Sequence, residues 1–121
     1  MRNKVAIVGA AESSKIGHVP EMGQVQLHCD AALRAMADAG LTPGDIDGIA
    51  CAEEVPWTIA ANLGLTPTWV DGTDVGGCAY MHHLRHAVAA IEAGHATTIL
   101  ITHGESGRSR VGTPGLDMMY T

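Results

Sequence analysis

The stretch DVGGCAYMHH, residues 74–83, contains the side chain best placed for covalent chemistry. Cys78 follows two glycines and opens a segment whose spacing predicts a helix over 78–93. Free N–H groups and the helix dipole at such a position stabilise a thiolate, the nucleophilic form of cysteine. Gly76 and Gly77 allow a tight turn and leave room for a substrate. Cys78 is therefore the candidate nucleophile, and the alternative is a cysteine that only packs.

The other two cysteines occupy different positions. Cys29 falls within a predicted helix and Cys51 within a predicted strand, where a cysteine usually serves as a small buried apolar side chain. An odd, unpatterned set of three cysteines argues against a disulfide framework.

Two histidines suggest a metal site only by their spacing. His82 and His86 lie four residues apart, as two ligands on one helix face must. A zinc site needs at least a third ligand, and the stretch HHLRH is not an H-E-x-x-H motif. A polar helix face is the simpler interpretation, and we predict no metal.

Two other patterns are weaker still. The apolar run that ends at Gly9 invites a dinucleotide site, but the G-x-G-x-x-G fingerprint is absent. Arg108 and Arg110, with Ser106 and Ser109, have the chemistry to bind phosphate groups. A solvated loop is the favoured interpretation of these four residues.

The elements that must position Cys78 alternate along the chain. Short apolar runs predict strands within 4–13, 46–52, 67–74 and 96–105, and helical spacing predicts helices within 22–40, 55–64 and 78–93. This βαβαβαβ order predicts an α/β domain, a mostly parallel sheet with covering helices. We expect residues 1–103 to form it and 104–121 to begin a loop or insertion region in a truncated chain.

Composition supports this interpretation. Hydrophobic residues make up 46% of the 121 residues and aromatic residues 3%, which favours closely packed helices on a sheet. A net charge of −6, with no basic cluster before the last segment, argues against nucleic-acid binding. With no signal-peptide pattern and no bilayer-spanning stretch, we expect no membrane association and a reduced, cytoplasmic protein.

Four segments together resemble the N-terminal half of the thiolase superfamily. They are KVAIVGAAES, ALRAMADAGLTPGDIDGI, DVGGCAYMHHLRHAVAAIEAG and TTILITHGES, and the similarity runs from about Lys4 to Arg110. The stretch HGESGRSR points to the bacterial branch related to sterol-carrier-protein thiolases and similar acetyl-CoA acetyltransferase-like proteins. The resemblance implies two similar halves stacked in five layers, with helices on both faces of the first sheet.

The resemblance also implies an activity. Cys78 matches the cysteine that begins the third helix of the first half, which accepts an acyl group from a coenzyme A thioester before Claisen condensation or thiolysis. The expected protein is an acyltransferase of lipid metabolism that holds no cofactor, takes an acyl-CoA substrate, and forms a homodimer through the strand within 67–74. The family's catalytic histidines and second cysteine lie in the second half, so we expect this chain alone to be inactive in condensation and thiolysis.

Two alternatives remain open. Some branches of the superfamily are aldolases or lyases that act on steroid side-chain thioesters beside a small OB-fold partner, and Cys78 would then be a bystander. The chain would otherwise be a non-catalytic fragment that only folds or dimerises. The acyl group and the substrate-binding residues stay undetermined, because the resemblance places the pocket walls beyond Thr121.

Overall fold

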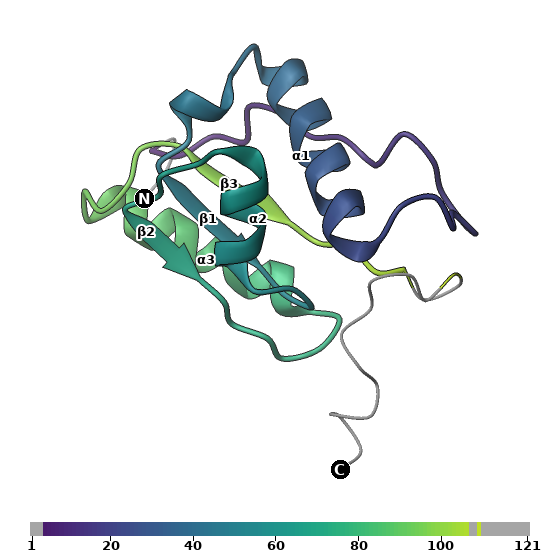
Figure 1. The fold of residues 1–121 in the computed structure, drawn as a ribbon. Coiled ribbons are helices and arrows are strands. Elements are labelled where there is room, and N and C mark those ends of the chain that lie inside the picture. Colours follow the sequence, from purple (N-terminus) through teal and green to yellow (C-terminus); the bar gives the residue numbers. More distant parts are fainter. Residues whose placement is uncertain (1–3, 107–108, 110–121) are drawn as a thin grey trace.

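The computed structural model describes residues 4–106 and 109, which form a three-stranded parallel sheet flanked by helices (Figure 1). The elements in chain order are α1 (Gln24–Ala39), the 3-10 helix η1 (Pro43–Asp45), β1 (Gly48–Cys51), α2 (Pro56–Leu63), β2 (Trp69–Asp71), α3 (Ala79–Glu92) and β3 (Ile99–Thr102). The strand order is β2-β1-β3, with β1 parallel to both neighbours. The predicted α/β architecture is confirmed.

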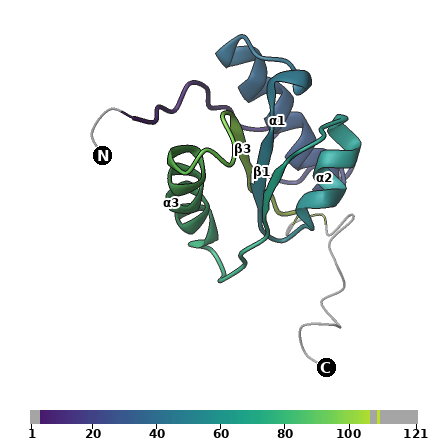
Figure 2. The same cartoon turned by 90° about the vertical axis from the view of Figure 1, so that its left-hand side faces the viewer.

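The helices cover both faces of the sheet, as expected. Figure 2 shows α3 on one side of the strands and both α1 and α2 on the other. Every residue of the central strand β1 is buried, which explains its continuous apolar sequence GIAC. The main core cluster fills the space between the sheet and the α1–α2 layer, and its buried members are Ala32, Met36, Ile46, Ile49, Cys51, Ile59, Ala60, Leu63, Leu65 and Leu100.

Glycines end two of the helices, as their sequence positions predict. Gly40 after α1 has φ of 71° and Gly64 after α2 has φ of 72°, both in the left-handed region that glycine adopts most easily. The amide of Leu41 donates to the Met36 carbonyl at 2.8 Å, so the chain turns sharply from α1 toward η1 and the start of β1.

The predicted strand within 4–13 is wrong. Residues 5–13 have no regular secondary structure, and the apolar side chains of Ile7 and Val8 are 75% and 64% exposed instead of buried. The segment runs along α1, where the Ala10 amide donates to the Asp38 carboxylate at 3.0 Å. A β-carbon on Gly9 would lie 2.6 Å from the Ala35 carbonyl oxygen. An apolar run becomes a strand only where a neighbouring strand pairs with it, and no described strand does so here.

Little of the expected loop region 104–121 falls within the described residues. The structure describes 104–106 and 109, so Arg108 and Arg110 lie outside it and the boundary after residue 103 stays a prediction. No helix within the described ranges is long and apolar enough to cross a membrane.

Candidate active site

Cys78 lies where the chain enters α3, near the carboxyl edge of the sheet. It is the residue just before the helix and is exposed, in agreement with its predicted place at a helix start. Its thiol lies 3.8 Å from the Val75 carbonyl oxygen, to which it donates, and makes no capping hydrogen bond to the helix. The Ala79 amide donates to the Gly76 carbonyl at 3.0 Å, so that helix-end donor is already occupied.

The two candidate metal ligands are not arranged as a metal site. His82 and His86 have ring centroids 6.3 Å apart, but His86 Nδ1 lies 2.7 Å from the Asp71 carboxylate. Burial acts to raise the pKa of Asp71, but hydrogen bonds from Thr73 and from His86 together outweigh it, so the pKa is lowered. Within 4–106 and at 109, no group of three or more His, Cys, Asp or Glu side chains is placed to hold a metal ion.

Titratable side chains gather beyond the ends of β1 and β3. The rings of His103 and Tyr80 are 5.8 Å apart, which brings the end of β3 to the first turn of α3, next to Cys78. His103 Nε2 also lies 3.9 Å from the Glu105 carboxylate. Glu53 adopts a left-handed backbone with φ of 69°, a conformation that is uncommon outside glycine.

Glu53 belongs to the same group of side chains. Its burial, followed by the nearby carboxylates of Asp74 and Glu105, raises the pKa of Glu53, while His103 opposes the shift. Neither Glu53 nor His103 was assigned a role from the sequence. The parallel strand order was a usable signal, because residues that follow parallel strands meet at one edge of the sheet.

The buried imidazole of His28 contacts the residues on both sides of His103 at this edge of the sheet. His28 of α1 is fully buried, with Nδ1 2.8 Å from the Thr102 hydroxyl and Nε2 3.1 Å from the Gly104 carbonyl oxygen. Burial lowers the pKa of His28 to about 4, although the Gly104 carbonyl opposes this. A β-carbon on Gly104 would lie 3.0 Å from the His28 ring, so the two residues fit closely. The imidazole therefore fixes the backbone just after His103.

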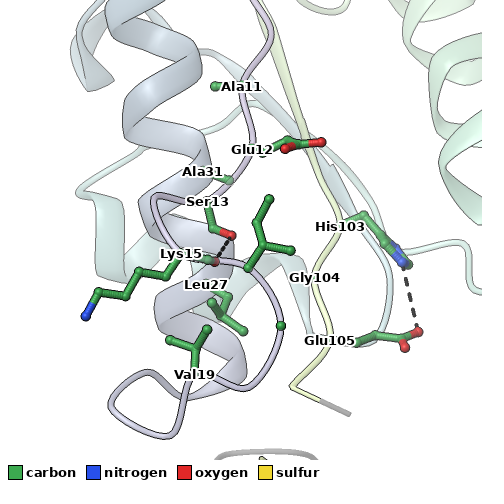
Figure 3. Close-up of a pocket in the computed structure, with 12 residues that line it drawn as sticks. Ala11, Glu12, Ser13, Lys15, Val19, Leu27, Ala31, His103, Gly104 and Glu105 are labelled. Atoms are coloured by element: carbon green, nitrogen blue, oxygen red, sulfur yellow. Dashed lines mark hydrogen bonds and ion pairs between the residues drawn. The ribbon is translucent and has the colours of Figure 1, made fainter. Parts of the chain in front are cut away.

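A shallow cavity of about 330 Å³ lies on the α1 side of this edge. It is lined by the 11–19 segment, by α1 and by residues 103–105. Figure 3 shows Lys15 on one side of the view, and His103 with Glu105 on the other. Lys15 pairs with Glu21, and its side chain is 60% exposed. The polar groups of this cavity therefore do not converge on one point, as they do in a formed ligand site.

Three comparisons bear on the identity of this chain. A curated steroid side-chain-cleaving aldolase from Thermomonospora curvata is 32% identical over 113 residues, which cover 88% of this chain and 28% of the aldolase. The solved Ltp2-ChsH2(DUF35) aldolase matches with a TM-score of 0.75 and 29% identity, covering 95% of this chain and 31% of that one. No protein-family model matches the chain.

A third protein extends the comparison. The solved monomeric SCP2-thiolase like protein type 1 from Mycobacterium smegmatis matches with a TM-score of 0.68 and 28% identity, covering 82% of this chain and 23% of that one. The sheet, the helix layers and these matches define a thiolase-type α/β fold. The chain belongs to the thiolase superfamily and spans less than a third of the length of these three relatives.

Proposed function

We propose that the chain is part of a thiolase-fold enzyme that acts on acyl-CoA thioesters, with Cys78 as the acyl acceptor. The observation that carries the proposal is the position of the thiol: it is exposed at the start of α3, while Cys51 is buried and Cys29 is half-buried. A thiol at a helix start on the carboxyl edge of a parallel sheet has the setting in which reactive cysteines and ligands are found.

The chemical step follows from this setting. The Cys78 thiolate attacks the thioester carbonyl, a new carbon–sulfur bond forms, and the bond to coenzyme A breaks. Coenzyme A leaves as a thiolate and takes up a proton, so the acyl group is conserved as an enzyme thioester. The hydrogen bond that Cys78 makes is to the Val75 carbonyl and not to an imidazole, so the general base for condensation would come from outside the described residues.

Acylation is tested directly by mass spectrometry. The chain is incubated with acetyl-CoA, and the expected result is a mass increase of one acetyl group, mapped to the peptide that contains Cys78. Cys78→Ala should abolish the modification, and Cys51→Ala is the matched control that should retain it. Acylation that persists in Cys78→Ala, or none in any variant at neutral pH, would contradict the proposal.

A second candidate function is carbon–carbon bond cleavage with Cys78 as a bystander. The two aldolases among the relatives favour it, and one of them was solved as Ltp2-ChsH2 with a DUF35 component. Under this alternative the enzyme works beside a partner protein of the OB-fold type. Aldolase activity that needs the partner and survives Cys78→Ala would select this function over acyl transfer.

The proposed assembly is a homodimer formed through β2. This strand is at the edge of the described sheet, where β1 is its only partner, and Val70 in it is 46% exposed. An unpaired edge strand is a natural surface for pairing with a second chain. Since the SCP2-thiolase like relative is described as monomeric, sedimentation of the complete protein decides the question, and a monomer would refute the dimer.

A further inference from the structure

His83 contacts the segment that leads into the proposed nucleophile. It is fully buried on the inner face of α3, and its Nε2 lies 2.7 Å from the Thr73 carbonyl oxygen. Because a carbonyl oxygen only accepts hydrogen bonds, Nε2 must carry the hydrogen and donate it. The other buried residues of α3 are Ala79, Ala87 and Ala90. His83 is therefore the one buried polar side chain on a helix face of alanines.

A second histidine of α3, His86, contacts the same segment at Asp71, two residues before Thr73. His86 Nδ1 lies 2.7 Å from Oδ2 of Asp71, the last residue of β2. The other oxygen of this carboxylate accepts from the Thr73 amide at 3.0 Å and from the Thr73 hydroxyl at 2.6 Å. Thr73 is thus held from two sides, by Asp71 and by His83.

Asp74 connects the rest of the segment to Glu53, two residues after β1, and to the segment's own backbone. Asp74 accepts a hydrogen bond from the Glu53 amide at 3.3 Å, and its other oxygen accepts from the Gly76 amide at 3.3 Å. Gly76 has φ of 88°, which lets the chain turn into α3. The backbone between Thr73 and Cys78 therefore has fixed points at Thr73 and Asp74, and a single turn separates these from the thiol.

The second ring nitrogen of His83 argues against a packing role alone. Nδ1 is buried and has no hydrogen-bond partner among the described residues. An unsatisfied buried polar atom destabilises a fold, so an apolar side chain of the same size would serve packing better. What the imidazole supplies, and an apolar side chain does not, is the donor to Thr73.

We propose that His83 is a positioning residue that holds Cys78 at the start of α3 through the Thr73 carbonyl. The proposal deepens the function suggested above, because it gives Cys78 a residue that sets its location. It predicts that loss of the His83 donor disturbs residues 72–79 and the reactivity of Cys78 while the rest of the fold persists.

The test compares three variants of the chain. His83→Gln keeps an N–H donor at nearly the same reach, while His83→Asn keeps the amide but is too short to reach Thr73. His82→Gln is the control, at the exposed position just before His83. Two readouts are followed: the rate at which iodoacetamide alkylates the Cys78 peptide, and amide hydrogen exchange over 72–79. A denaturant titration of each variant confirms that it is folded.

We expect His83→Asn to slow alkylation of Cys78 by about threefold or more and to speed exchange over 72–79, because the thiol is no longer held at the helix start. His83→Gln and His82→Gln should stay within about twofold of the unmodified chain. A folded His83→Asn with an unchanged or faster alkylation rate, or with unchanged exchange, would overturn the proposal.

A further variant covers the case in which His83→Asn fails to fold. Asp71→Asn weakens the hold on Thr73 from the end of β2. The proposal expects the same two changes at smaller size, and no change would refute it. Neither readout depends on acyl transfer. If Cys78 is never acylated, the proposed function is refuted. The positioning role of His83 is still tested independently by the alkylation and exchange rates.

Discussion

Cys51 and Cys78 both belong to the carboxyl edge of the sheet, yet their surroundings are opposite. Cys51 is the last residue of β1, is fully buried, and donates to the Glu54 carbonyl at 3.2 Å. Burial raises the pKa of the Cys51 thiol to about 12, although the Thr102 side chain opposes this. Cys78 lies beyond the strands at a helix start and is exposed. The comparison shows that a strand end buries a thiol, while the loop that leaves the sheet presents one.

The two cysteines are also supported differently. Thr102, which pairs with Cys51 across the sheet, contacts the buried His28 imidazole. The surroundings of Cys51 are therefore part of the core. Cys78 depends on the segment after β2, which is fixed by the His83 side chain of α3 and by the backbone amide of Glu53, two residues after β1. Changes near Cys51 should therefore affect mainly stability, and changes near Cys78 should affect mainly reactivity.

The largest expected difference is in alkylation. With a pKa of about 12, only about one in 10⁴ of the Cys51 thiols is ionised near pH 8, and burial blocks access as well. We expect iodoacetamide to modify Cys78 at least about 1,000-fold faster than Cys51 in the folded chain. Peptide mass spectrometry over time measures both rates, with a urea-unfolded sample as the control in which they converge. Comparable rates in the folded chain would remove the distinction between the two sites.

The next prediction concerns the pH dependence of the protein's stability, which arises from His28, the residue that holds Thr102 beside Cys51. His28 has a folded pKa of about 4 against an ordinary value of 6.5, so the unfolded chain binds more protons between these values. Stability is fully present above pH 6.5 and falls as the pH drops toward 4, by about 3 kcal/mol in total. Denaturant titrations from about pH 7 to pH 4 measure this fall.

His28→Gln is the control for that prediction, since it removes the titrating group. In this variant the free energy of unfolding should change less between pH 6.5 and 4. Carboxylates whose pKa is lowered by hydrogen bonds take up their protons only at lower pH. Asp45 is one of these: hydrogen bonds from the Thr42 amide and hydroxyl lower its pKa below 3.8. A profile as steep in His28→Gln as in the unmodified chain would assign the fall to another group.

A pair of alanine substitutions tests the same contrast at smaller size. Cys51→Ala leaves a void in the core cluster, and we expect it to lower the free energy of unfolding by about 1–2 kcal/mol. Cys78→Ala removes an exposed side chain and should change it by less than about 0.5 kcal/mol. Urea unfolding of both variants measures the difference. A larger loss in Cys78→Ala would mean that this thiol stabilises the fold.

The local parts of this arrangement were predictable from the sequence. Helical spacing located α1, α2 and α3, and the same reasoning placed Cys78 at a helix start. The strand within 4–13 failed because strand formation needs a partner, which an apolar run does not reveal. The contacts that hold the site could not be predicted from the sequence for a similar reason, because they join distant parts of the chain. His28 and Thr102, for example, are 74 positions apart. The one local clue was a histidine among the alanines of α3, at His83.

The smallest expected effect separates the two glycines before Cys78. A β-carbon at either Gly76 or Gly77 would meet no atom within 4 Å, so space does not distinguish them. Their backbones do, because Gly76 has φ of 88° and Gly77 is not among the positive-φ glycines. Gly76→Ala should therefore cost about 1 kcal/mol of stability, while Gly77→Ala should be neutral or slightly stabilising. Urea unfolding and the Cys78 alkylation rate together test this. Equal losses of stability in the two variants would show that the turn into α3 does not depend on the left-handed backbone of Gly76. The inference that this turn positions Cys78 would then be contradicted.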